Sequence, residues 1–367
     1  MRIIILCLSP ARGGLELYAL DEFRQLTERG HDCLFIAARD SYLHSVLEKE
    51  KLPFILLNPR LFRIPLWSAY KLSKLTESFN PDILHFHWGK DLYIAAVYKS
   101  MQKKPVKLVH SRHMNYTRSK KDIFHCWFYK KIDLLLTGTD LLKELAIQFL
   151  PLEQNKIKRL YLGTSEPNIS EDACTHIFNS QFPKRQLNLA IYGRIEEGKG
   201  QHLVIDAVSC LLKDNYDISL TMIGHAMDKQ YKSLQEFKIS RSKLHHNIRF
   251  VDFMENASES MCCFDIVVLS THCETFGLVL IEAMRSGVAV IGTDAGGVPE
   301  IIQDGKSGLL VEARNSTSMC NAIKKLYNDE PYRIKLASEG KKRADEMFST
   351  DLHYTQLQNV LNESFNS

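Results

Sequence analysis

Short runs rich in Ile, Leu and Val alternate with longer amphipathic stretches from the first residue almost to the end of the chain. Runs of this kind are typical of strands buried in a parallel sheet. The longer stretches have helical spacing, and a helix is the usual connection between two parallel strands. The alternation therefore predicts an α/β fold in which βαβ units build parallel sheets.

The predicted strands form one set in each half of the chain. In the first half we expect them near 2–8, 33–37, 54–57, 82–87, 107–110 and 134–137, with a first helix over about 14–29. In the second half we expect them near 187–192, 218–223, 248–251, 266–269, 288–291 and 308–311. Helices over about 316–327, 330–346 and 350–364 end the chain. Two sets of strands predict two sheets.

A chain of 367 residues is too long for one ordinary hydrophobic core and suits two α/β domains of about 150–200 residues each. We expect one Rossmann-like domain over 1–165, a second over 166–349, and a C-terminal helix over 350–367 that packs back toward the first domain. Ligands of doubly wound sheets bind beyond the carboxyl ends of the strands. The expected arrangement is therefore two Rossmann-like domains that face each other across a ligand-binding cleft.

The composition is that of a globular protein. Hydrophobic residues make up 45% of the chain and charged residues 25%, which does not fit a disordered, collagen-like or coiled-coil protein. The apolar opening stops at Ser9-Pro10, too early for a signal peptide or a membrane span. The nine cysteines are an odd number without a CxxC pair, which indicates reduced thiols. We therefore expect a cytoplasmic protein.

Positive charge is concentrated between Lys90 and Lys131. The whole chain has a formal net charge of +4, and this segment holds eleven Lys and Arg against Asp91 and Asp122. One interpretation is a solvated surface. The other is a platform for an anionic membrane, at the inner face of the cytoplasmic membrane, or for an acidic lipid-linked molecule. Nucleic acid is not an expected partner. Aromatic residues among the charges favour an interfacial helix, namely Tyr116, Phe124, Trp127, Phe128 and Tyr129.

Two glutamates eight residues apart follow the predicted strand that ends at Leu269. If a helix begins near Phe276–Gly277, its first amides and the positive end of its dipole can hold a phosphate or sugar oxygen. Glu274 then precedes the helix, and Glu282 lies about two turns along it, so that a long ligand can reach both carboxylates. The structural alternative is that Glu274 caps the helix and Glu282 forms a surface ion pair.

The residues after these glutamates favour a ligand-binding function. Gly287-Val-Ala-Val leads into Gly296-Gly297-Val-Pro-Glu300 and then Gly305-Lys-Ser-Gly308. A glycine pair lets the backbone approach a ligand without a Cβ in the way. The stretch from Asp265 to Val311 closely resembles the donor-binding core of retaining glycosyltransferase family 4, whose members have the GT-B fold. The match is long, and each part of the family pattern is present.

The resemblance implies roles for the residues around Glu274. The donor is a nucleotide-diphosphate sugar, which is a substrate, and neither a metal nor another cofactor is expected. Glu274 orients hydroxyls of the transferred sugar, and Glu282 holds the ribose. Further donor contacts come from Thr275, Phe276, Gly277 and Leu278.

A second motif, Tyr192-Gly193-Arg194, follows another predicted strand and leads to Lys199. Breaking a sugar–phosphate bond leaves added negative charge on a diphosphate, which a metal or fixed cations must neutralise. No DxD-like metal pair follows a predicted strand, whereas Arg194 and Lys199 suit phosphate oxygens. A solvated basic turn is the alternative. The resemblance implies that Arg194 and Lys199 bind the donor diphosphate, with Gly193 beside them.

Two further motifs lie in the N-terminal half. Gly13 and Gly14 form the first strand-to-helix turn, which is neither a Walker loop nor a GxGxxG fingerprint. Such a turn is often only tight geometry, but by resemblance it lets the donor or acceptor approach. His85 and His87 share one face of a strand, with too few further ligands for zinc. A histidine here is often a satisfied polar group. The resemblance implies that His87 contacts the transferred sugar. His110, Arg112 and His113, which follow the next predicted strand, can line the acceptor side.

Together the motifs predict a retaining glycosyltransferase of the hexosyltransferase type. Its acceptor is a glycan or a lipid-linked molecule bound by the N-terminal domain, in lipopolysaccharide, capsule or exopolysaccharide biosynthesis. No carboxylate nucleophile for a double inversion is apparent, so the resemblance implies a reaction on one face, with the leaving phosphate helping to remove the acceptor proton. The alternative is an inactive nucleotide-sugar-binding scaffold in a polysaccharide assembly complex. Such a scaffold is expected to lose one of the site residues, and none is lost.

Overall fold

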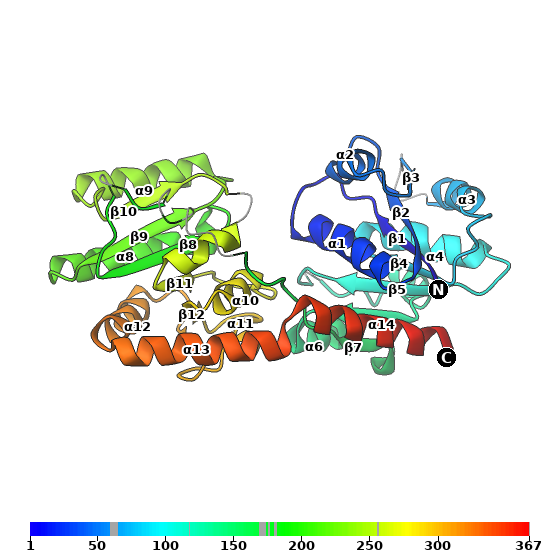
Figure 1. Cartoon of the computed structure of the whole chain (residues 1–367). Helices are drawn as coiled ribbons and strands as arrows, with labels where there is room; N and C mark the ends of the chain where they lie inside the picture. The colour runs from blue at the N-terminus through cyan, green and yellow to red at the C-terminus, as the bar shows by residue number, and fades with distance from the viewer. Residues whose placement is uncertain are drawn as a thin grey trace. The chain divides into compact units, whose positions relative to one another are not determined.

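The computed structural model of the chain describes residues 1–58, 65–116, 118–168, 174, 177–179, 182–254 and 257–366. The chain divides into two compact units. Unit 1 comprises Met1–Tyr161 and Asp351–Ser367, and unit 2 comprises Leu162–Thr350. Each unit has its own parallel sheet with helices around it (Figure 1), which confirms the predicted α/β class with two Rossmann-like domains.

Unit 1 is built on a seven-stranded sheet in the order β3-β2-β1-β4-β5-β6-β7, and every pairing in it is parallel. The chain runs outward from β1 to β3, returns to β4 beside β1, and continues outward on the other side. The switch between these directions lies between β1 and β4, where ligands of such sheets bind. The strands are β1 (Arg2–Cys7), β2 (Asp32–Ala37), β3 (Phe54–Leu56), β4 (Ile83–Phe86), β5 (Lys107–Arg112), β6 (Leu134–Thr137) and β7 (Ile157–Arg159).

The central strand β1 supplies both faces of the unit 1 core. Ile3 and Ile5 pack on one face and Ile4 and Leu6 on the other, because side chains alternate along a strand. All four are fully buried, and burying such a side chain contributes about 1.5–3 kcal/mol. The first face is covered by α1 (Gly14–Glu28), α2 (Tyr42–Lys49) and α14 (Thr350–Asn366). The second is covered by α3 (Leu66–Leu75), α4 (Leu92–Met101), α5 (Ile123–Tyr129) and α6 (Asp140–Phe149).

The C-terminal helix α14 is part of the unit 1 core. Its buried side chains Tyr354, Leu357 and Leu361 belong to the same apolar cluster as Ile3 and Ile5. The Tyr354 hydroxyl donates a hydrogen bond of 2.7 Å to the carboxylate of Asp21 in α1. Unit 1 therefore needs both ends of the chain. Residue 367, which the sequence assigned to this helix, lies outside the described residues.

Unit 2 is built on a six-stranded parallel sheet in the order β10-β9-β8-β11-β12-β13. Its direction switch lies between β8 and β11, the strands that precede the two strongest sequence motifs. The strands are β8 (Leu187–Tyr192), β9 (Ile218–Ile223), β10 (Ile248–Val251), β11 (Ile266–Leu269), β12 (Ala289–Thr293) and β13 (Leu309–Val311). The helices are α8 (Gln201–Lys213), α9 (Lys229–Arg241), α10 (Leu278–Arg285), α11 (Val298–Ile301), α12 (Ser316–Asn328) and α13 (Glu330–Met347).

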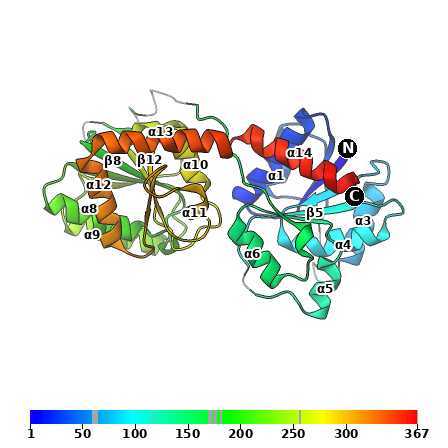
Figure 2. The same ribbon diagram turned by 90° about the horizontal axis from the view of Figure 1, so that it is seen from below.

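Helices cover both faces of the unit 2 sheet. Apolar side chains of α8, α9 and α12 pack in one cluster with Leu187, Leu189 and Ile191 of β8. Helix α13 packs against α10 and β12. Figure 2 shows α13 on one side of β8 and β12, with α8 and α9 on the other. The sheet is thus buried on both faces, as its continuous apolar strands predict.

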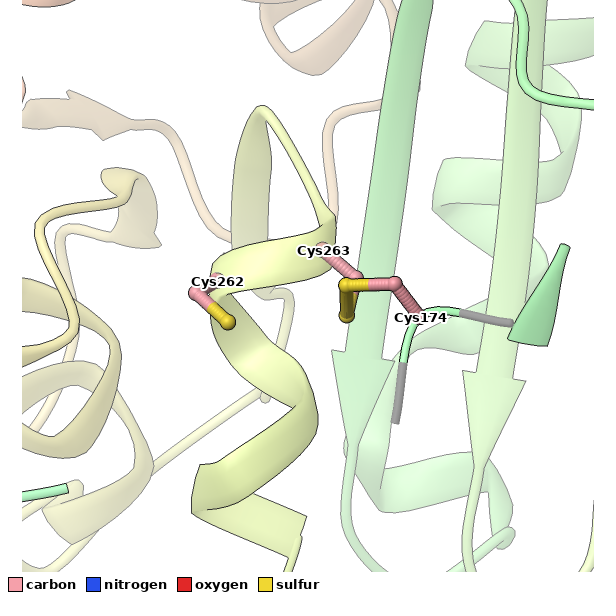
Figure 3. Close-up of side chains that lie close together, drawn as sticks. All are labelled: Cys174, Cys262 and Cys263. Carbon is pink, nitrogen blue, oxygen red and sulfur yellow. A yellow bond between two sulfur atoms is a disulfide. The ribbon is translucent and has the colours of Figure 1, made fainter. Parts of the chain in front are cut away.

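Two cysteines of unit 2 correct the expectation of reduced thiols. Cys174 and Cys263 are joined by a disulfide across 89 residues of sequence, and Cys263 follows Cys262 at the end of the 3₁₀ helix η4 (Ala257–Cys263) (Figure 3). The other seven cysteines form no disulfide in the part of the chain that the structure describes. Cysteine spacing could not reveal this pair, because the fold and not the sequence brings the two thiols together.

Candidate active site

The glycine loop that follows β12 holds the backbone of Glu274 in place. The N–H of Gly297 donates a hydrogen bond of 2.8 Å to the carbonyl oxygen of Glu274. A Cβ on Gly296 would lie 2.0 Å from the same oxygen, and Gly296 has the left-handed φ of +64° that favours glycine. Glycine at position 296 therefore lets the loop pack closely against the backbone of Glu274. The sequence predicted instead that the glycine pair lets a ligand approach, and it did not predict this backbone contact.

The carboxylate of Glu274 is paired with Lys199. The Lys199 Nζ donates a hydrogen bond of 2.7 Å to Glu274 Oε2, and Glu274 Oε1 accepts one of 3.1 Å from the N–H of Thr275. The Lys199 and Glu274 side chains are 22% and 20% exposed. An ion pair with this access to solvent contributes about 1 kcal/mol or less. The structure brings these two predicted site residues together in an ion pair that a bound anion can replace.

Lys199 is held in place by an interlock between two loops. It ends the 3₁₀ helix η3 (Glu197–Lys199) after β8, and its carbonyl oxygen accepts a hydrogen bond of 2.8 Å from the Ser270 hydroxyl after β11. The N–H of His272 donates one of 3.0 Å to the carbonyl of Gly198. At Gly200, with a φ of +68°, a Cβ would lie 2.1 Å from the Ser270 carbonyl oxygen. The two loops therefore fit together only without a side chain at this position.

Arg194 lies on the surface of unit 2 beside the same loops. It follows Gly193, whose φ is +135°, and its carbonyl oxygen accepts a hydrogen bond of 2.8 Å from the Gln201 side chain. Its guanidinium forms an ion pair with Glu196 Oε1, 3.0 Å away. The backbone of Arg194 is thus fixed while its charge stays accessible.

The predicted helix after Glu274 is α10, which begins at Leu278. Gly277 forms its N-cap with a φ of +103°, and a Cβ there would press on the Leu269 side chain. Phe276 is buried and packs against the Phe348 ring with centroids 6.0 Å apart. The first amides of a helix point back beyond its N-terminus. The positive end of α10 therefore lies next to the loop that carries Glu274.

Glu282 lies in α10 without a cation beside it. In the described part of the chain no ion pair involves Glu282, which contradicts the surface-ion-pair alternative. Burial raises the pKa of this carboxyl group to about 7. A half-buried carboxyl group with a raised pKa and no ion-pair partner among the described residues is a candidate ligand contact.

Gly13 and Gly14 lie in unit 1 at the start of α1. Gly13 is the N-cap with extended backbone, and a Cβ there would meet Glu16 Oε2 at 3.2 Å. A Cβ at Gly14 would meet nothing within 4 Å. Packing within unit 1 therefore does not require glycine at position 14, and the space beside it is open. The predicted approach of donor or acceptor to this turn stays a prediction.

His87 directly follows β4 and its side chain is fully buried. Its Nδ1 is 3.4 Å from His113 Nε2, and its Nε2 is 3.7 Å from Glu22 Oε1. The Tyr18 and His113 rings pack against it, with centroids 5.5 and 5.7 Å away. Burial lowers the pKa of His87 well below its usual value, so its imidazole is neutral. His87 lies at the switch point of unit 1, with the Tyr18 and His113 rings packed against it. Its contact with the transferred sugar stays a prediction.

Glu22 and Tyr18 of α1 are not among the site residues predicted from the sequence. Glu22 is fully buried and lies 2.6 Å from His85 Nδ1. The sequence feature that could have revealed Glu22 is its position on the buried face of the helix, between Leu20 and Leu26. A charge in that place requires a partner in the core.

Two family models match nearly consecutive parts of the chain. The model described as Glycosyltransferase Family 4 matches residues 12–165, and the model described as Glycosyl transferases group 1 matches residues 173–343. The chain belongs to glycosyltransferase family 4. The family 4 chain is therefore a glycosyltransferase, and the second match contains the whole Glu274–Gly308 region from which the resemblance was inferred.

Individual relatives of this family 4 chain agree with that assignment. N-acetyl-alpha-D-glucosaminyl L-malate synthase of Bacillus anthracis is 24% identical over 98% of this chain and 96% of its own. Capsular polysaccharide biosynthesis glycosyltransferase CapM of Staphylococcus aureus is 26% identical over 57% of this chain and 56% of its own. The crystal structure of Anabaena Alr3699/HepE in complex with UDP has a TM-score of 0.83 at 20% identity, covering 99% and 100% of the two chains. The structural likeness supports the two-domain GT-B fold.

Gly296→Ala tests the seat of Glu274. The added Cβ would overlap the Glu274 carbonyl oxygen and strain a left-handed backbone, at a cost of about 1–3 kcal/mol for the strain alone. We expect a lower melting temperature and the loss of glycosyltransferase activity. Gly198→Ala is the matched control, because a Cβ there meets nothing within 4 Å. Equal melting temperatures and equal activity in both variants would contradict the proposed packing.

Proposed function

We propose that this glycosyltransferase transfers a sugar from a nucleotide-diphosphate sugar, with retention and without a metal ion. The observation that carries the proposal is the set of charges at the carboxyl ends of β8 and β11 and in α10. Two cations, Arg194 and Lys199, lie in the same unit as two carboxyl groups, Glu274 and Glu282. A nucleotide-diphosphate sugar offers the complementary groups: a diphosphate for the cations, and sugar and ribose hydroxyls for the carboxylates.

In the proposed donor complex Lys199 and Glu274 exchange partners. The diphosphate accepts charge-assisted hydrogen bonds from Lys199 and Arg194. Glu274, released from Lys199, accepts hydrogen bonds from sugar hydroxyls. The exchange replaces one partly solvent-accessible ion pair by charge-assisted contacts of Lys199 with the diphosphate and of Glu274 with hydroxyl groups. Both cations then stabilise the charge that develops on the leaving diphosphate.

Fixed cations are our proposed substitute for a metal ion at the diphosphate. Arg194 and Lys199 lie after β8, in the loop next to the one that carries Glu274, and their charges support the metal-independent proposal.

We propose that retention follows a reaction on one face of the sugar. The bond from the anomeric carbon to the leaving phosphate oxygen breaks, and a bond to the acceptor oxygen forms on the same face. The acceptor proton passes to the departing phosphate. The contacts of Glu274 with Lys199 and with the Thr275 amide suit a residue that orients hydroxyl groups. The Leu278 end of α10 adds its positive dipole to the site.

We propose a glycan or lipid-linked acceptor of the cell envelope, in lipopolysaccharide, capsule or exopolysaccharide biosynthesis. The capsular polysaccharide relative CapM supports this product class. The UDP bound by HepE makes uridine the first donor base to test. Unit 1, with Gly13, Gly14 and His87 at its switch point, is the proposed place of the acceptor.

We also propose that unit 1 contacts the anionic inner face of the cytoplasmic membrane from the cytoplasm. Helix α5 exposes Ile123, Phe124 and Trp127, of which Ile123 is 92% exposed, beside Lys130 and Lys131. Apolar side chains with basic neighbours suit an anionic bilayer surface. In the part of the chain that the structure describes, no helix is long and apolar enough to cross a membrane.

A donor screen tests the central proposal. Calorimetry with UDP-, GDP- and ADP-sugars should find micromolar binding of one donor, unchanged by EDTA. Arg194→Ala should weaken it about tenfold or more, because a hydrogen bond to a charged group is lost. Arg241→Ala, at an exposed cation in α9, is the matched control.

Each outcome of the donor screen tests a different element of the proposed function. Binding of no nucleotide sugar by the folded protein would overturn the donor. Loss of binding in EDTA would overturn metal independence. Binding without donor hydrolysis or transfer to any acceptor would show an inactive scaffold, whereas inversion at the transferred sugar would overturn retention.

The pH dependence of donor binding tests the role of Glu282. Its pKa of about 7 lies above the usual value, so the ionised form that accepts ribose hydrogen bonds is lost as the pH falls through about 7. We expect the affinity to fall by up to about tenfold per pH unit below that point. Glu282→Gln should bind weakly at every pH without this dependence. A pH-independent wild type would contradict a ribose contact by the carboxylate.

Vesicle binding tests the membrane contact. The protein should sediment with phosphatidylglycerol vesicles and not with phosphatidylcholine vesicles, and should be released by salt. The double variant Ile123→Ser/Trp127→Ser should lose this binding. Phe237→Ser, at an aromatic residue of α9 that is 62% exposed, should retain it. Equal binding by both variants would place the membrane contact elsewhere.

A further inference from the structure

Three side chains in the interior of unit 1 lie close enough together to share a metal ion. Glu22 of α1, His85 of β4 and His87, which directly follows β4, each offer one ligand atom, and these atoms lie within 4.8 Å of one another. All three side chains are fully buried. The sequence places the two histidines on one face of a strand without a further ligand beside them, and the fold supplies that ligand from α1.

The ligand atoms of this set lack hydrogen-bond partners. Among the residues that the structure describes, no hydrogen bond involves either carboxyl oxygen of Glu22, Nδ1 of His85 or Nε2 of His87. His85 Nδ1 is 2.6 Å from Glu22 Oε1, but the two groups are not aligned as a hydrogen bond. Buried polar atoms without a partner are rare, and an ion or a water between them is the usual explanation.

The distances between these atoms suit a metal ion. With metal–ligand bonds of about 2.0–2.2 Å, the ligand atoms of a tetrahedral zinc site lie about 3.4 Å apart. Glu22 Oε1 is 2.6 Å from His85 Nδ1 and 3.7 Å from His87 Nε2, on either side of that value. The two imidazole rings lie beside each other, with centroids 4.7 Å apart. Small side-chain shifts are therefore sufficient to bring all these atoms to one ion.

The other two ring nitrogens have the partners that metal-bound histidines require. A histidine that binds a metal through one nitrogen donates the N–H of the other to a fixed acceptor. His85 Nε2 is 2.8 Å from the Ser111 hydroxyl of β5, and His87 Nδ1 is 3.4 Å from His113 Nε2. Both neighbours can accept a hydrogen bond. The lone pairs of His85 Nδ1 and His87 Nε2 are then available to an ion.

A divalent ion also balances the charge that is buried with Glu22. A carboxylate in a core needs a compensating charge. In the described part of the chain the ion-pair contacts of Glu22 are with His85 and His87, and none is with a lysine or an arginine. A neutral imidazole is the form that binds a metal, and it carries no charge to balance the carboxylate. The ion itself supplies the positive charge.

We propose that Glu22, His85 and His87 bind a divalent transition-metal ion, either zinc or iron(II), since both suit two histidines and one carboxylate. The two oxygens of Glu22 and the two imidazole nitrogens offer four donor atoms. The ion joins α1 to the end of β4 and stabilises unit 1. It is separate from the metal-independent chemistry proposed for the donor, whose residues lie in unit 2. A bound ion uses His87 Nε2, so a sugar contact of His87 must come from another atom of its ring.

Metal analysis of the purified protein tests this site. Protein from cells grown with zinc, iron and manganese salts should hold about one ion per chain after gel filtration in EDTA, because a fully buried ion leaves only when the fold opens. Glu22→Gln and His85→Leu should each lose most of this metal. His110→Leu, the matched control, should keep it, because the buried His110 ring stacks on Phe86 and not against Glu22.

A second variant separates this site from the cysteines of unit 2. Cys174, Cys262 and Cys263 also bring their sulfur atoms within 4.8 Å of one another. Cys262→Ser/Cys263→Ser should therefore keep the metal that His85→Leu loses. Metal that the double serine variant loses and that His85→Leu and Glu22→Gln keep would overturn the proposal.

Refolding of the wild type tests the role of the ion without any substitution. Protein unfolded in a chelator and refolded with zinc, or anaerobically with iron(II), should melt about 5 °C or more above protein refolded without metal. A larger increase with one ion would support the site and identify that ion. A folded wild type without bound metal, with one melting temperature in all three samples, would overturn the proposal and favour a buried water between the ligands. These readouts do not use the donor, so the metal site and the proposed function can fail independently.

Discussion

The charges of unit 2 depend on a close contact between loops that no side chain could enter. Gly200 lies against the Ser270 carbonyl, and Gly296 lies against the Glu274 carbonyl. These backbone contacts bring Lys199 to within 2.7 Å of Glu274. The attraction between the two charges is too weak to hold the loops by itself. Rigid backbone packing therefore holds the charges in place, and the side chains remain able to change partners when a ligand arrives.

Hydrophobic pattern was sufficient to predict most strands and helices, because a strand buried on both faces must be continuously apolar. Strand β6 and strands β8 to β11 have the predicted bounds, and others differ by a few residues at their ends. The pattern missed β7, whose three residues Ile157-Lys-Arg include a single apolar side chain at the sheet edge. It also missed the Cys174–Cys263 disulfide, since thiols 89 residues apart meet only through the fold.

The candidate site was predictable where function needs particular residues in a fixed order along the chain. Arg194, Lys199, Glu274 and the start of α10 follow strands as expected. Two features were not predictable from order alone. The partner of Lys199 is a residue 75 positions away, and the use of Gly296 as a seat for Glu274 needs coordinates. Glu22 escaped notice because an acidic residue in an amphipathic helix is normally assigned to solvent.

The placement of α14 in unit 1 has a consequence for the way the protein is made. The core that contains Ile3 and Ile5 is completed by Tyr354 and Leu357, which are synthesised after the whole of unit 2. Translation proceeds at about 5–20 residues per second, so the first unit waits roughly ten seconds or more for its final helix while all of unit 2 is synthesised. During this time the nascent first unit exposes an apolar face, which makes it a natural client for chaperones, and a stop codon before residue 350 would leave that face permanently uncovered.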